Sequence, residues 1–317
     1  MIVLTRNRAA IGLALLVACA GAAIWVIAAA DAPISSDSSS CAASADLAMV
    51  RIPGGTAQLG GTDLPDDAPP RRVTVPSFRI SATEVTNRQF AAFVSATGYR
   101  TVAERAPRAA DHPGVDPALL VPGSAVFSPP SQPGSLDDMT GWWRFVPGAD
   151  WRHPEGPGSH LRGRANYPVV HVAYEDALAY ARWRGHGLPA EAQWELAARG
   201  GLDGKRFAWG DEYAPGGSHR ANAWQGAFPL VNSGADGFVG RSPVACFPPN
   251  GFGLYDMIGN VWEWTSDGDP QAAGTRIIKG GSYLCAPNYC ARYRPAARQF
   301  GDSSLGASHI GFRTVAP

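Results

Sequence analysis

The chain has 317 residues, and its 27 Lys and Arg balance its 27 Asp and Glu, so the formal net charge is zero. A neutral chain without a Lys- or Arg-rich run has no field that would steer nucleic acid, and we expect no nucleic-acid partner. The 37 glycines, 27 prolines and 10 tryptophans favour a loop-rich fold with aromatic anchors over a helical bundle.

The N-terminal segment, residues 1–30, differs in composition from the rest of the chain. Arg6 and Arg8 precede an uncharged run, Ala9–Ala30. This run is long enough to cross a bilayer as a helix, for which about 20 residues suffice. The arginines predict that the N-terminus stays cytoplasmic and that the remainder is exported. We therefore predict a membrane anchor through residues 9–30, with the following domain extracytoplasmic.

Two alternatives to an anchor stay open. Ala28–Ala30 fits a signal-peptidase site, which would leave a secreted protein, and residues 16–19 resemble a lipoprotein box. The Ser-rich stretch 31–46 is typical of a flexible linker, and we interpret its Cys41 as a free thiol. A globular domain is expected over residues 47–317.

The first part of this domain is predicted to supply scaffold. Residues 49–55 indicate a strand that leads into a turn, and residues 72–78 indicate a second short strand. The polar segment 83–87 opens an amphipathic helix. The apolar face of this helix consists of Phe90, Phe93 and Val94.

The middle of the chain is less regular, and residues 105–140 show no assignable pattern. The tryptophans that follow are more typical of a core than of a binding site, and they are Trp142, Trp143 and Trp151. We predict a strand at Pro168–His171 and helices over Tyr174–Arg184 and Ala190–Arg199. Within the last helix, Glu195 is expected to face solvent.

An Asn- and Asp-rich loop, Asn222–Phe238, follows these helices. Such side chains together with backbone carbonyls are oxygen ligands of the kind that calcium prefers, but ordinary turn chemistry explains the same composition. Cys246 lies among apolar residues and is interpreted as an inert buried thiol.

The segment 279–294, KGGSYLCAPNYCARYR, places Cys285 and Cys290 behind a Gly-Gly-Ser turn that includes Ser282. Gly280 and Gly281 permit backbone angles that other residues resist, so we expect a constrained loop. A structural disulfide would explain the pair. The spacing is not the Cys-x-x-Cys of thioredoxin-type redox motifs, and no second Cys/His cluster completes a zinc site. A soft pair of sulfur ligands that selects Cu(I) is the second interpretation that stays open, beside the structural disulfide.

Together with Pro295–Arg298 and His309–Arg313, this segment resembles the formylglycine-generating enzymes, the family of sulfatase-modifying oxidases. The resemblance extends from about Met49 to Thr314. It implies a single α+β domain over 47–317, irregular and loop-rich, with the C-type-lectin-like fold of that family and little regular secondary structure. We expect a monomer.

The resemblance also implies the chemistry. Cys285 and Cys290 would hold Cu(I) and use O2 to convert a cysteine in a Cys-x-Pro-x-Arg segment of an unfolded sulfatase to Cα-formylglycine, with an external thiol as reductant. Ser282 would position oxygen or water beside the metal. The substrate would bind extended, before it folds, and Glu104 is a candidate partner for its arginine.

Two structural calcium sites are implied as well. The ligands of the first are Asn222, Ala223, Asp236 and Phe238, and those of the second are Asp256, Gly259, Val261 and Glu263. Asn260 and Trp262 are candidates for supporting residues. Pro295 and Thr314 stand where secreted animal members carry further disulfide cysteines, so the chain is of the bacterial type in this respect.

Two rival functions share the implied fold. A non-catalytic extracytoplasmic binding module would carry Cys285 and Cys290 as a disulfide that is indifferent to copper. Sulfoxide synthases of thiohistidine biosynthesis depend on an iron-binding histidine set in an additional domain. The 7 histidines of this chain are not accompanied by such a domain, which disfavours the synthases.

Overall fold

The computed structural model describes Cys41 and residues 48–64, 67–111, 113–269 and 272–317. The predicted anchor, and the predicted linker apart from Cys41, lie outside the described residues. Within the described ranges, no helix is both long and apolar enough to cross a membrane.

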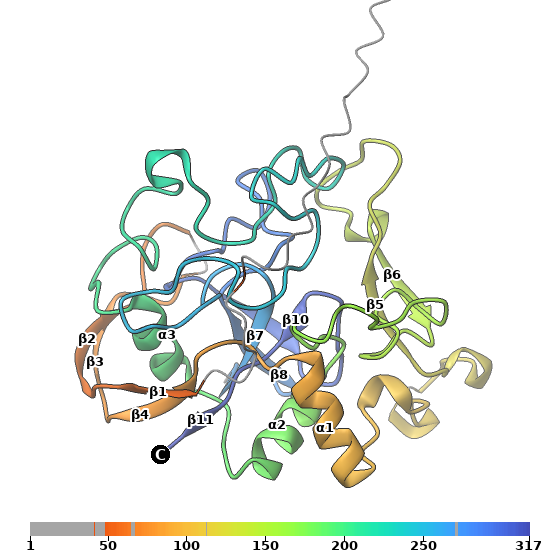
Figure 1. Cartoon of the computed structure of the whole chain (residues 1–317). Helices are drawn as coiled ribbons and strands as arrows, with labels where there is room; N and C mark the ends of the chain where they lie inside the picture. The colour runs from red at the N-terminus through yellow and green to blue at the C-terminus, as the bar shows by residue number, and fades with distance from the viewer. Residues whose placement is uncertain (1–40, 42–47, 65–66, 112, 270–271) are drawn as a thin grey trace, which may run out of the picture. The chain divides into compact units, whose positions relative to one another are not determined.

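The beginning and the end of the domain share one antiparallel sheet (Figure 1). Its strands, in the order β1-β4-β11, are β1 (Met49–Ile52), β4 (Phe78–Ser81) and β11 (Val315–Ala316). A hairpin of β2 (Gly55–Leu59) and β3 (Arg71–Val75) lies beside it. The prediction of one strand over 72–78 was wrong, because the chain forms β3 and β4 on either side of Pro76, which lacks the N–H that a strand needs.

A second sheet determines where the Gly-Gly-Ser segment lies. Its order is β10-β7-β8-β9, with β10 parallel to β7 and the other pairs antiparallel. The strands are β7 (Trp262–Gly268), β8 (Thr275–Lys279), β9 (Arg298–Asp302) and β10 (Ile310–Gly311). With these directions, the starts of β7, β9 and β10 meet the end of β8 at one edge. The segment 280–297 leaves and re-enters the sheet there.

The three predicted helices are confirmed, and they are α1 (Asn87–Thr97), α2 (Tyr174–Trp183) and α3 (Glu191–Arg199). Thr86 caps α1 in a reciprocal capping box with Gln89. In α3, the backbone N–H of Ala190 donates to Gln193 Oε1 at 2.9 Å, so this half of a capping box satisfies the start of the helix.

Two other features were not predicted correctly. The expected strand at Pro168–His171 is absent from the described structure, where Pro168 forms only an isolated bridge to Thr86 and His171 has a positive φ of 59°. The unassigned stretch contains β5 (Gly123–Phe127), which pairs with β6 (Trp143–Pro147) in a hairpin.

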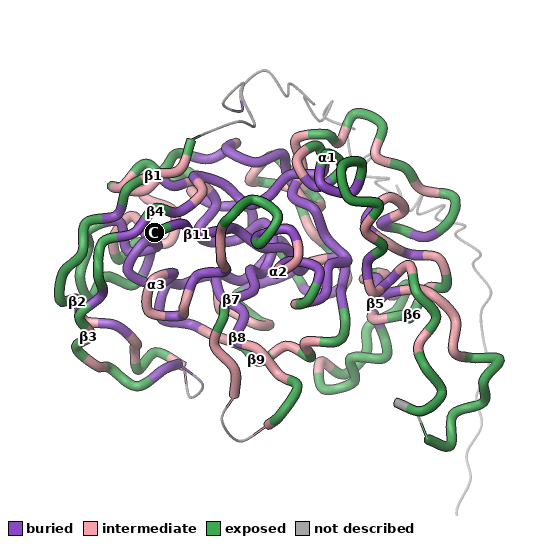
Figure 2. Tube along the Cα trace, turned by 90° about the horizontal axis from the view of Figure 1, so that it is seen from below, coloured by how far each residue is buried: buried purple, intermediate pink, exposed green. Residues whose placement is uncertain are grey.

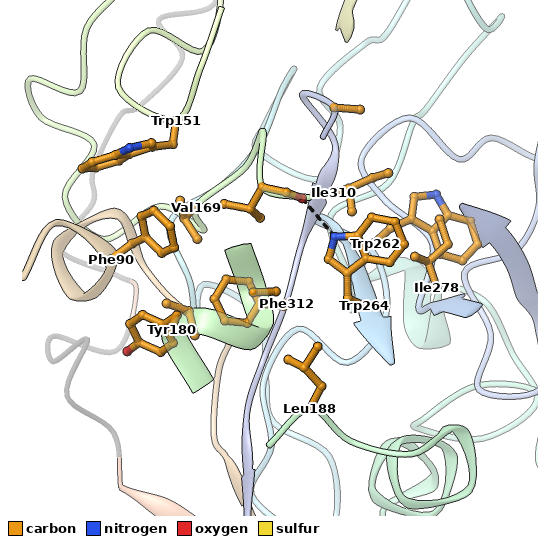
Figure 3. Packing of buried hydrophobic residues seen from close by; sticks show 14 of the residues in the cluster. Phe90, Trp151, Val169, Tyr180, Leu188, Trp262, Trp264, Ile278, Ile310 and Phe312 are labelled. Carbon is orange, nitrogen blue, oxygen red and sulfur yellow. Dashed lines mark hydrogen bonds between the residues drawn. The ribbon is translucent and has the colours of Figure 1, made fainter. Parts of the chain in front are cut away.

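The core lies between α1, α2 and the second sheet, and the exposed residues follow the rim of the domain (Figure 2). Trp142 and Trp151 are buried, as the core interpretation of the tryptophans predicted, whereas Trp143 is only partly buried. Phe90 and Tyr180 stack at a centroid distance of 6.0 Å, and Phe312 packs edge-on against both (Figure 3). The helices therefore meet the strands through aromatic rings.

The expectation that Glu195 faces solvent was wrong. Its carboxylate is fully buried and accepts from Arg199 at 2.6 Å, from the backbone N–H of Gly60 at 2.7 Å and from Lys279 at 3.4 Å. Lys279 is itself 0% exposed and is the last residue before the Gly-Gly-Ser turn. Helix α3 therefore contacts the end of β8 through the charged side chain of Glu195.

The interpretation of Cys41 and Cys246 as unpaired thiols was also wrong. Their sulfurs form a disulfide with an S–S distance of 1.97 Å across a sequence separation of 205 residues. The count of five cysteines contained a signal for this pairing, because setting aside the one inside the apolar run leaves an even number.

The buried position of Glu195 leads to a stability prediction. Replacing Glu195 with Gln leaves buried Arg199 without its carboxylate partner and leaves Lys279 with only the more distant Glu191, at 3.7 Å. Breaking a buried pair costs about 3–5 kcal/mol. We expect a loss of this size in the free energy of unfolding, measured by urea denaturation. Glu175→Gln removes the exposed partner of Arg105 and should cost below about 1 kcal/mol. Equal losses of unfolding free energy in the two variants would contradict a stabilising role of the buried contacts of Glu195 with Arg199 and Lys279.

Candidate functional site

The cysteine loop, residues 280–297, is held in shape by its own backbone. Ala286 and Tyr289 exchange backbone hydrogen bonds of 2.8 and 3.1 Å, which closes a tight turn between the two cysteines. At the base of the loop, Gly281 has a φ of 75°, and a Cβ there would lie 3.0 Å from the backbone of Tyr293. Only glycine permits this approach, so the constrained loop that was predicted is confirmed.

The turn also contains backbone conformations that side chains disfavour. Cys290 has a φ of 74° and Ala291 a φ of 48°. Non-glycine residues in this region cost about 1–3 kcal/mol each and persist where the surrounding contacts enforce them. Such positions are concentrated at functional sites, so the part of the loop around Cys290 is a candidate functional site.

A cavity of about 390 Å³ opens beside the loop, at the edge of the second sheet where the strand ends meet. It contains both cysteines and Ser282, and its other walls are mainly aromatic or apolar. The lining residues are Met139, Trp143, Phe228, Trp262, Ser282, Leu284, Cys285, Tyr289, Cys290, Arg292, Gln299 and His309. Residues from strand ends and loops that are far apart in the sequence therefore converge on the predicted thiol pair.

The structure brings Cys285 and Cys290 together and joins their sulfurs in a disulfide with an S–S distance of 2.29 Å. Cys285 is buried, whereas Cys290 is partly exposed to the cavity. Ser282 is fully buried, and its Oγ accepts from the backbone N–H of Leu284 at 3.2 Å. In the reduced state, the two sulfurs are close enough to act on one atom.

His309 is a cavity residue that the sequence analysis did not single out. Its ring lies against Trp143 with a centroid distance of 4.6 Å, and its Nδ1 has no hydrogen-bond partner among the described residues. Burial, together with the charge of Arg241, lowers the pKa of His309 to about 3. The imidazole is therefore neutral at physiological pH and has one nitrogen available.

Glu104, the candidate partner of a substrate arginine, does not line this cavity. Its carboxylate pairs with Arg152 and accepts from the backbone and hydroxyl of Thr101 at 2.9 and 2.8 Å. No carboxylate of the described residues lines the cavity. The cavity lining therefore supplies no acidic partner for a substrate arginine.

The four residues predicted for the first calcium site lie together. Asp236 accepts from the backbone N–H groups of Ala223 and Phe238 at 3.0 and 2.9 Å. Asn222 is buried, and its Oδ1 has no partner among the described residues, while its amide nitrogen donates to Asn260. An orphaned buried oxygen beside a carboxylate fits a calcium ion, which takes oxygen ligands.

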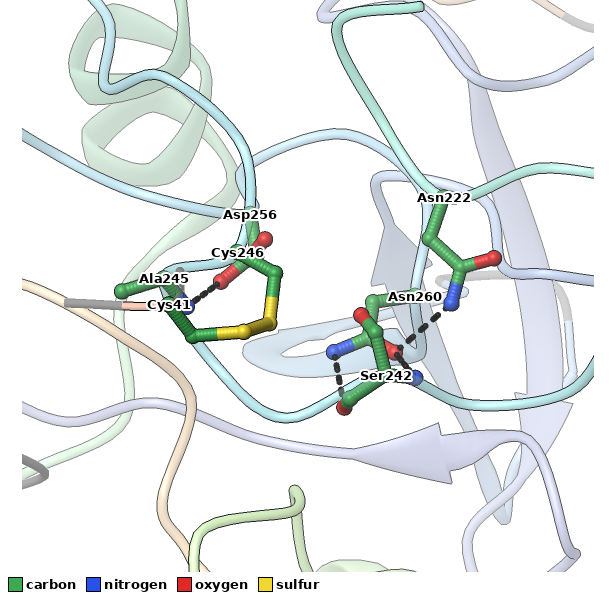
Figure 4. The surroundings of a disulfide bond; sticks show 7 residues. All are labelled: Cys41, Asn222, Ser242, Ala245, Cys246, Asp256 and Asn260. Atoms are coloured by element: carbon green, nitrogen blue, oxygen red, sulfur yellow. Dashed lines mark hydrogen bonds between the residues drawn. A yellow bond between two sulfur atoms is a disulfide. The ribbon is translucent and has the colours of Figure 1, made fainter. Parts of the chain in front are cut away.

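The second predicted site is next to the first and to the Cys41–Cys246 disulfide (Figure 4). Gly259 touches the backbone of Asn222, where a Cβ would lie 2.2 Å from its carbonyl oxygen. Asp256 accepts from the backbone N–H of Ala245 at 2.6 Å. Val261 immediately precedes β7 and is buried. The Ala245–Cys246 turn therefore connects the disulfide to this site.

Glu263 is engaged by Arg313, whose Nε and Nη2 each donate to it at 2.7 Å. The remaining Arg313 hydrogen bonds go to the backbone carbonyls of Ser81, Ala82 and Tyr255. The guanidinium is thus fully occupied by partners other than the neighbouring carboxylate of Glu84.

Glu84 is a second residue that the sequence analysis missed, because it lies in a segment that was interpreted as scaffold. It is 0% exposed, and neither carboxylate oxygen has a hydrogen-bond partner among the described residues. Burial and the nearby charges of Asp256 and Glu263 raise its pKa well above the usual value. If all three carboxyl groups are ionised, one guanidinium leaves two negative charges unbalanced. Protonation of Glu84 or a bound divalent cation would relieve this imbalance.

The donor sets differ in what they fit. Two adjacent cysteine sulfurs in a largely apolar cavity fit Cu(I), which soft sulfur ligands select. The oxygen sets fit calcium only with backbone carbonyls included, since no three His, Cys, Asp or Glu side chains of the described residues converge as a metal site.

Comparison with known proteins agrees with this architecture. The family described as "Sulfatase-modifying factor enzyme 1-like domain" matches residues 36–317. The chain is 51% identical to a formylglycine-generating enzyme of Mycobacterium tuberculosis, over 84% of this chain and 97% of that protein. It is 45% identical to the formylglycine-generating enzyme of Mus musculus, over 84% of this chain and 74% of that protein.

Other similarities bear on activity and on fold. A Mus musculus protein named "Inactive C-alpha-formylglycine-generating enzyme 2" is 42% identical over 84% of this chain and 85% of that protein, so overall identity does not by itself establish activity. The solved structure of PvdO from Pseudomonas aeruginosa matches with a TM-score of 0.59 at 23% identity, over 84% of this chain and 93% of that one, and shows the fold alone. The expected α+β, loop-rich fold is confirmed, and the chain belongs to the sulfatase-modifying factor family, whose similar members include the bacterial formylglycine-generating enzymes.

Proposed function

We propose that this protein is an oxidase that converts a cysteine of an unfolded sulfatase, in a Cys-x-Pro-x-Arg segment, to Cα-formylglycine with O2. The single observation that carries the proposal is the convergence of Cys285, Cys290 and Ser282 on one cavity beside a strained turn. The relatives named formylglycine-generating enzymes support the same reaction class.

The electron balance of this reaction explains why a thiol reductant is needed. Converting the thiol-bearing methylene of cysteine to an aldehyde, with water as the oxygen source and release of hydrogen sulfide, removes two electrons and two protons. Reducing O2 to water takes four electrons and four protons. An external thiol pair therefore supplies the other two electrons and two protons and leaves as a disulfide.

The residues of this chain bind and enclose the reacting cysteine. The aromatic side chains of the cavity would shield a bound segment from part of the solvent, and we expect this segment to bind in an extended conformation. Neutral His309 can accept or donate one hydrogen bond beside the reacting sulfur, and Ser282 holds a hydroxyl in another wall of the cavity. Held by Cys285 and Cys290, Cu(I) would supply the one-electron chemistry that O2 requires.

A second candidate is a binding module in which Cys285 and Cys290 are a permanent disulfide. The disulfide between them and the similarity to the protein named inactive favour this alternative. The two functions differ in one respect, since only the oxidase needs both thiols reduced.

The Cys41–Cys246 disulfide supports an extracytoplasmic site of action, because such bonds form and persist in oxidising compartments. We propose that the domain is exported, and that its clients are met there before they fold. Whether residues 9–30 then act as an anchor or as a cleaved signal is tested by sequencing the N-terminus of the mature protein.

The catalytic proposal predicts that Cys290→Ser abolishes conversion of a Cys-x-Pro-x-Arg peptide, because one sulfur is lost from the pair. The assay follows peptide mass and traps the aldehyde with a hydrazide, using the reduced protein and Cu(I). Cys246→Ser is the matched control, since it removes the other disulfide without touching the cavity, and it should retain turnover. Full activity of Cys290→Ser would refute the copper pair.

We further propose that the two oxygen sets hold structural calcium. A ligand that binds only the folded state at 100 times its Kd stabilises it by about 2.7 kcal/mol, so chelation with EGTA should lower the Tm by several degrees. Glu84→Gln should shrink the gain on adding calcium, because it removes one of the three carboxyl groups around Arg313. Glu175→Gln is the exposed control. An EGTA-insensitive Tm would exclude calcium.

A further inference from the structure

The side of the loop that carries Cys290 is connected to a buried ion pair whose two residues do not line the cavity. Arg294 is buried and donates through Nη2 to Asp67 Oδ1 at 2.7 Å and through Nη1 to Asp67 Oδ2 at 3.1 Å. Asp67 is equally buried, and its Oδ2 also accepts from the backbone N–H groups of Asp63 and Leu64. The Arg294 guanidinium therefore forms a bidentate pair with the Asp67 carboxylate, which fixes the orientation of both groups.

The same guanidinium reaches back toward the strained turn. Arg294 Nε donates to the carbonyl oxygen of Ala291 at 3.4 Å. On its other side, the backbone N–H of Ala291 donates to the carbonyls of Tyr289 and Ala286 at 3.0 and 3.2 Å. The residue that follows Cys290 is therefore held through both its N–H and its carbonyl.

We propose that Arg294, fixed by Asp67, is the positioning residue of Cys290, and that this ion pair keeps the Cys290 sulfur beside that of Cys285. The pair acts from outside the cavity through the backbone of Ala291, and it touches neither sulfur. The catalytic importance of this spacing rests on the proposed oxidase function, whereas the spacing itself does not.

Two properties depend on how closely the sulfurs are held. Oxidation joins them with the loss of two electrons and two protons, and reduction by two molecules of glutathione restores both thiols and yields glutathione disulfide. A loosened Cys290 lowers the effective concentration of one thiol at the other, so the disulfide becomes easier to reduce. The binding of one Cu(I) ion by both sulfurs weakens for the same reason.

The test measures the equilibrium between the Cys285–Cys290 dithiol and disulfide in the full-length protein, in glutathione buffers of known ratio. Asp67→Asn keeps the shape but removes the charge, and it should lower the oxidation equilibrium constant about tenfold, which corresponds to about 30 mV. Arg294→Lys keeps the charge but loses the bidentate fork and should shift the constant in the same direction. Competition for Cu(I) with a coloured chelator should show a parallel loss of affinity.

Two controls separate positioning from simple destabilisation. Asp63→Asn removes the more exposed partner of Arg294, at 3.0 Å, and should change the constant by less than about twofold. Val94→Ala in α1 should lower the Tm without moving the redox equilibrium of the folded protein. If Asp67→Asn or Arg294→Lys folds with both the redox equilibrium and the Cu(I) affinity unchanged, the positioning role is wrong.

The two proposals fail in distinguishable ways. If the wild-type protein converts no peptide but Asp67→Asn still shifts the redox equilibrium, the positioning role stands and the oxidase function falls. If the wild-type protein converts the peptide and the variants leave the equilibrium unchanged, only the positioning role is lost.

Discussion

Both ends of the cysteine loop are anchored in buried charge, and the candidate site depends on this constraint. Lys279, at the end of β8, faces Glu195 of α3, and Arg294, after Cys290, is gripped by Asp67. Buried ion pairs contribute little net stability because desolvation offsets their attraction, but a mispaired alternative is costly. Such pairs therefore select one loop conformation over others, which matters when two sulfurs must stay adjacent in an otherwise irregular segment.

The second sheet determines where the cavity lies relative to the anchored loop. Because β10 runs parallel to β7 while β8 and β9 run antiparallel to their neighbours, four strand ends meet at the edge where the loop leaves. Trp262 and His309 come from two of these ends and line the cavity together with the thiols. Their rings provide a largely apolar enclosure, and the aromatic contacts that close it also belong to the packing of the domain.

Charge that packing leaves unsatisfied is concentrated at the predicted calcium sites. Glu84 is buried, and its carboxylate has no hydrogen-bond partner among the described residues. The N–H groups of Arg313 donate instead to Glu263 and to backbone carbonyls. Apart from Glu263 in β7, the residues of both sites lie in irregular loops. The Gly259–Asn222 contact joins these loops, and the Ala245–Cys246 turn connects them to the Cys41 disulfide. In a domain with so little regular structure, these contacts and the disulfide stabilise the arrangement of the loops, as backbone hydrogen bonds do within a sheet.

The sequence by itself determined the helices, the scarcity of regular structure and the thiol loop, because capping residues, apolar spacing and glycine turns are local properties. The family resemblance added the fold class and the candidate ligands. Only the tertiary structure decided that Glu195 is buried rather than solvated, that Cys41 pairs with Cys246, and that Glu84, Asp67 and His309 surround or support the site. These residues are distant in sequence from their partners, and no local pattern encodes which buried charge or thiol each will meet once the chain has folded.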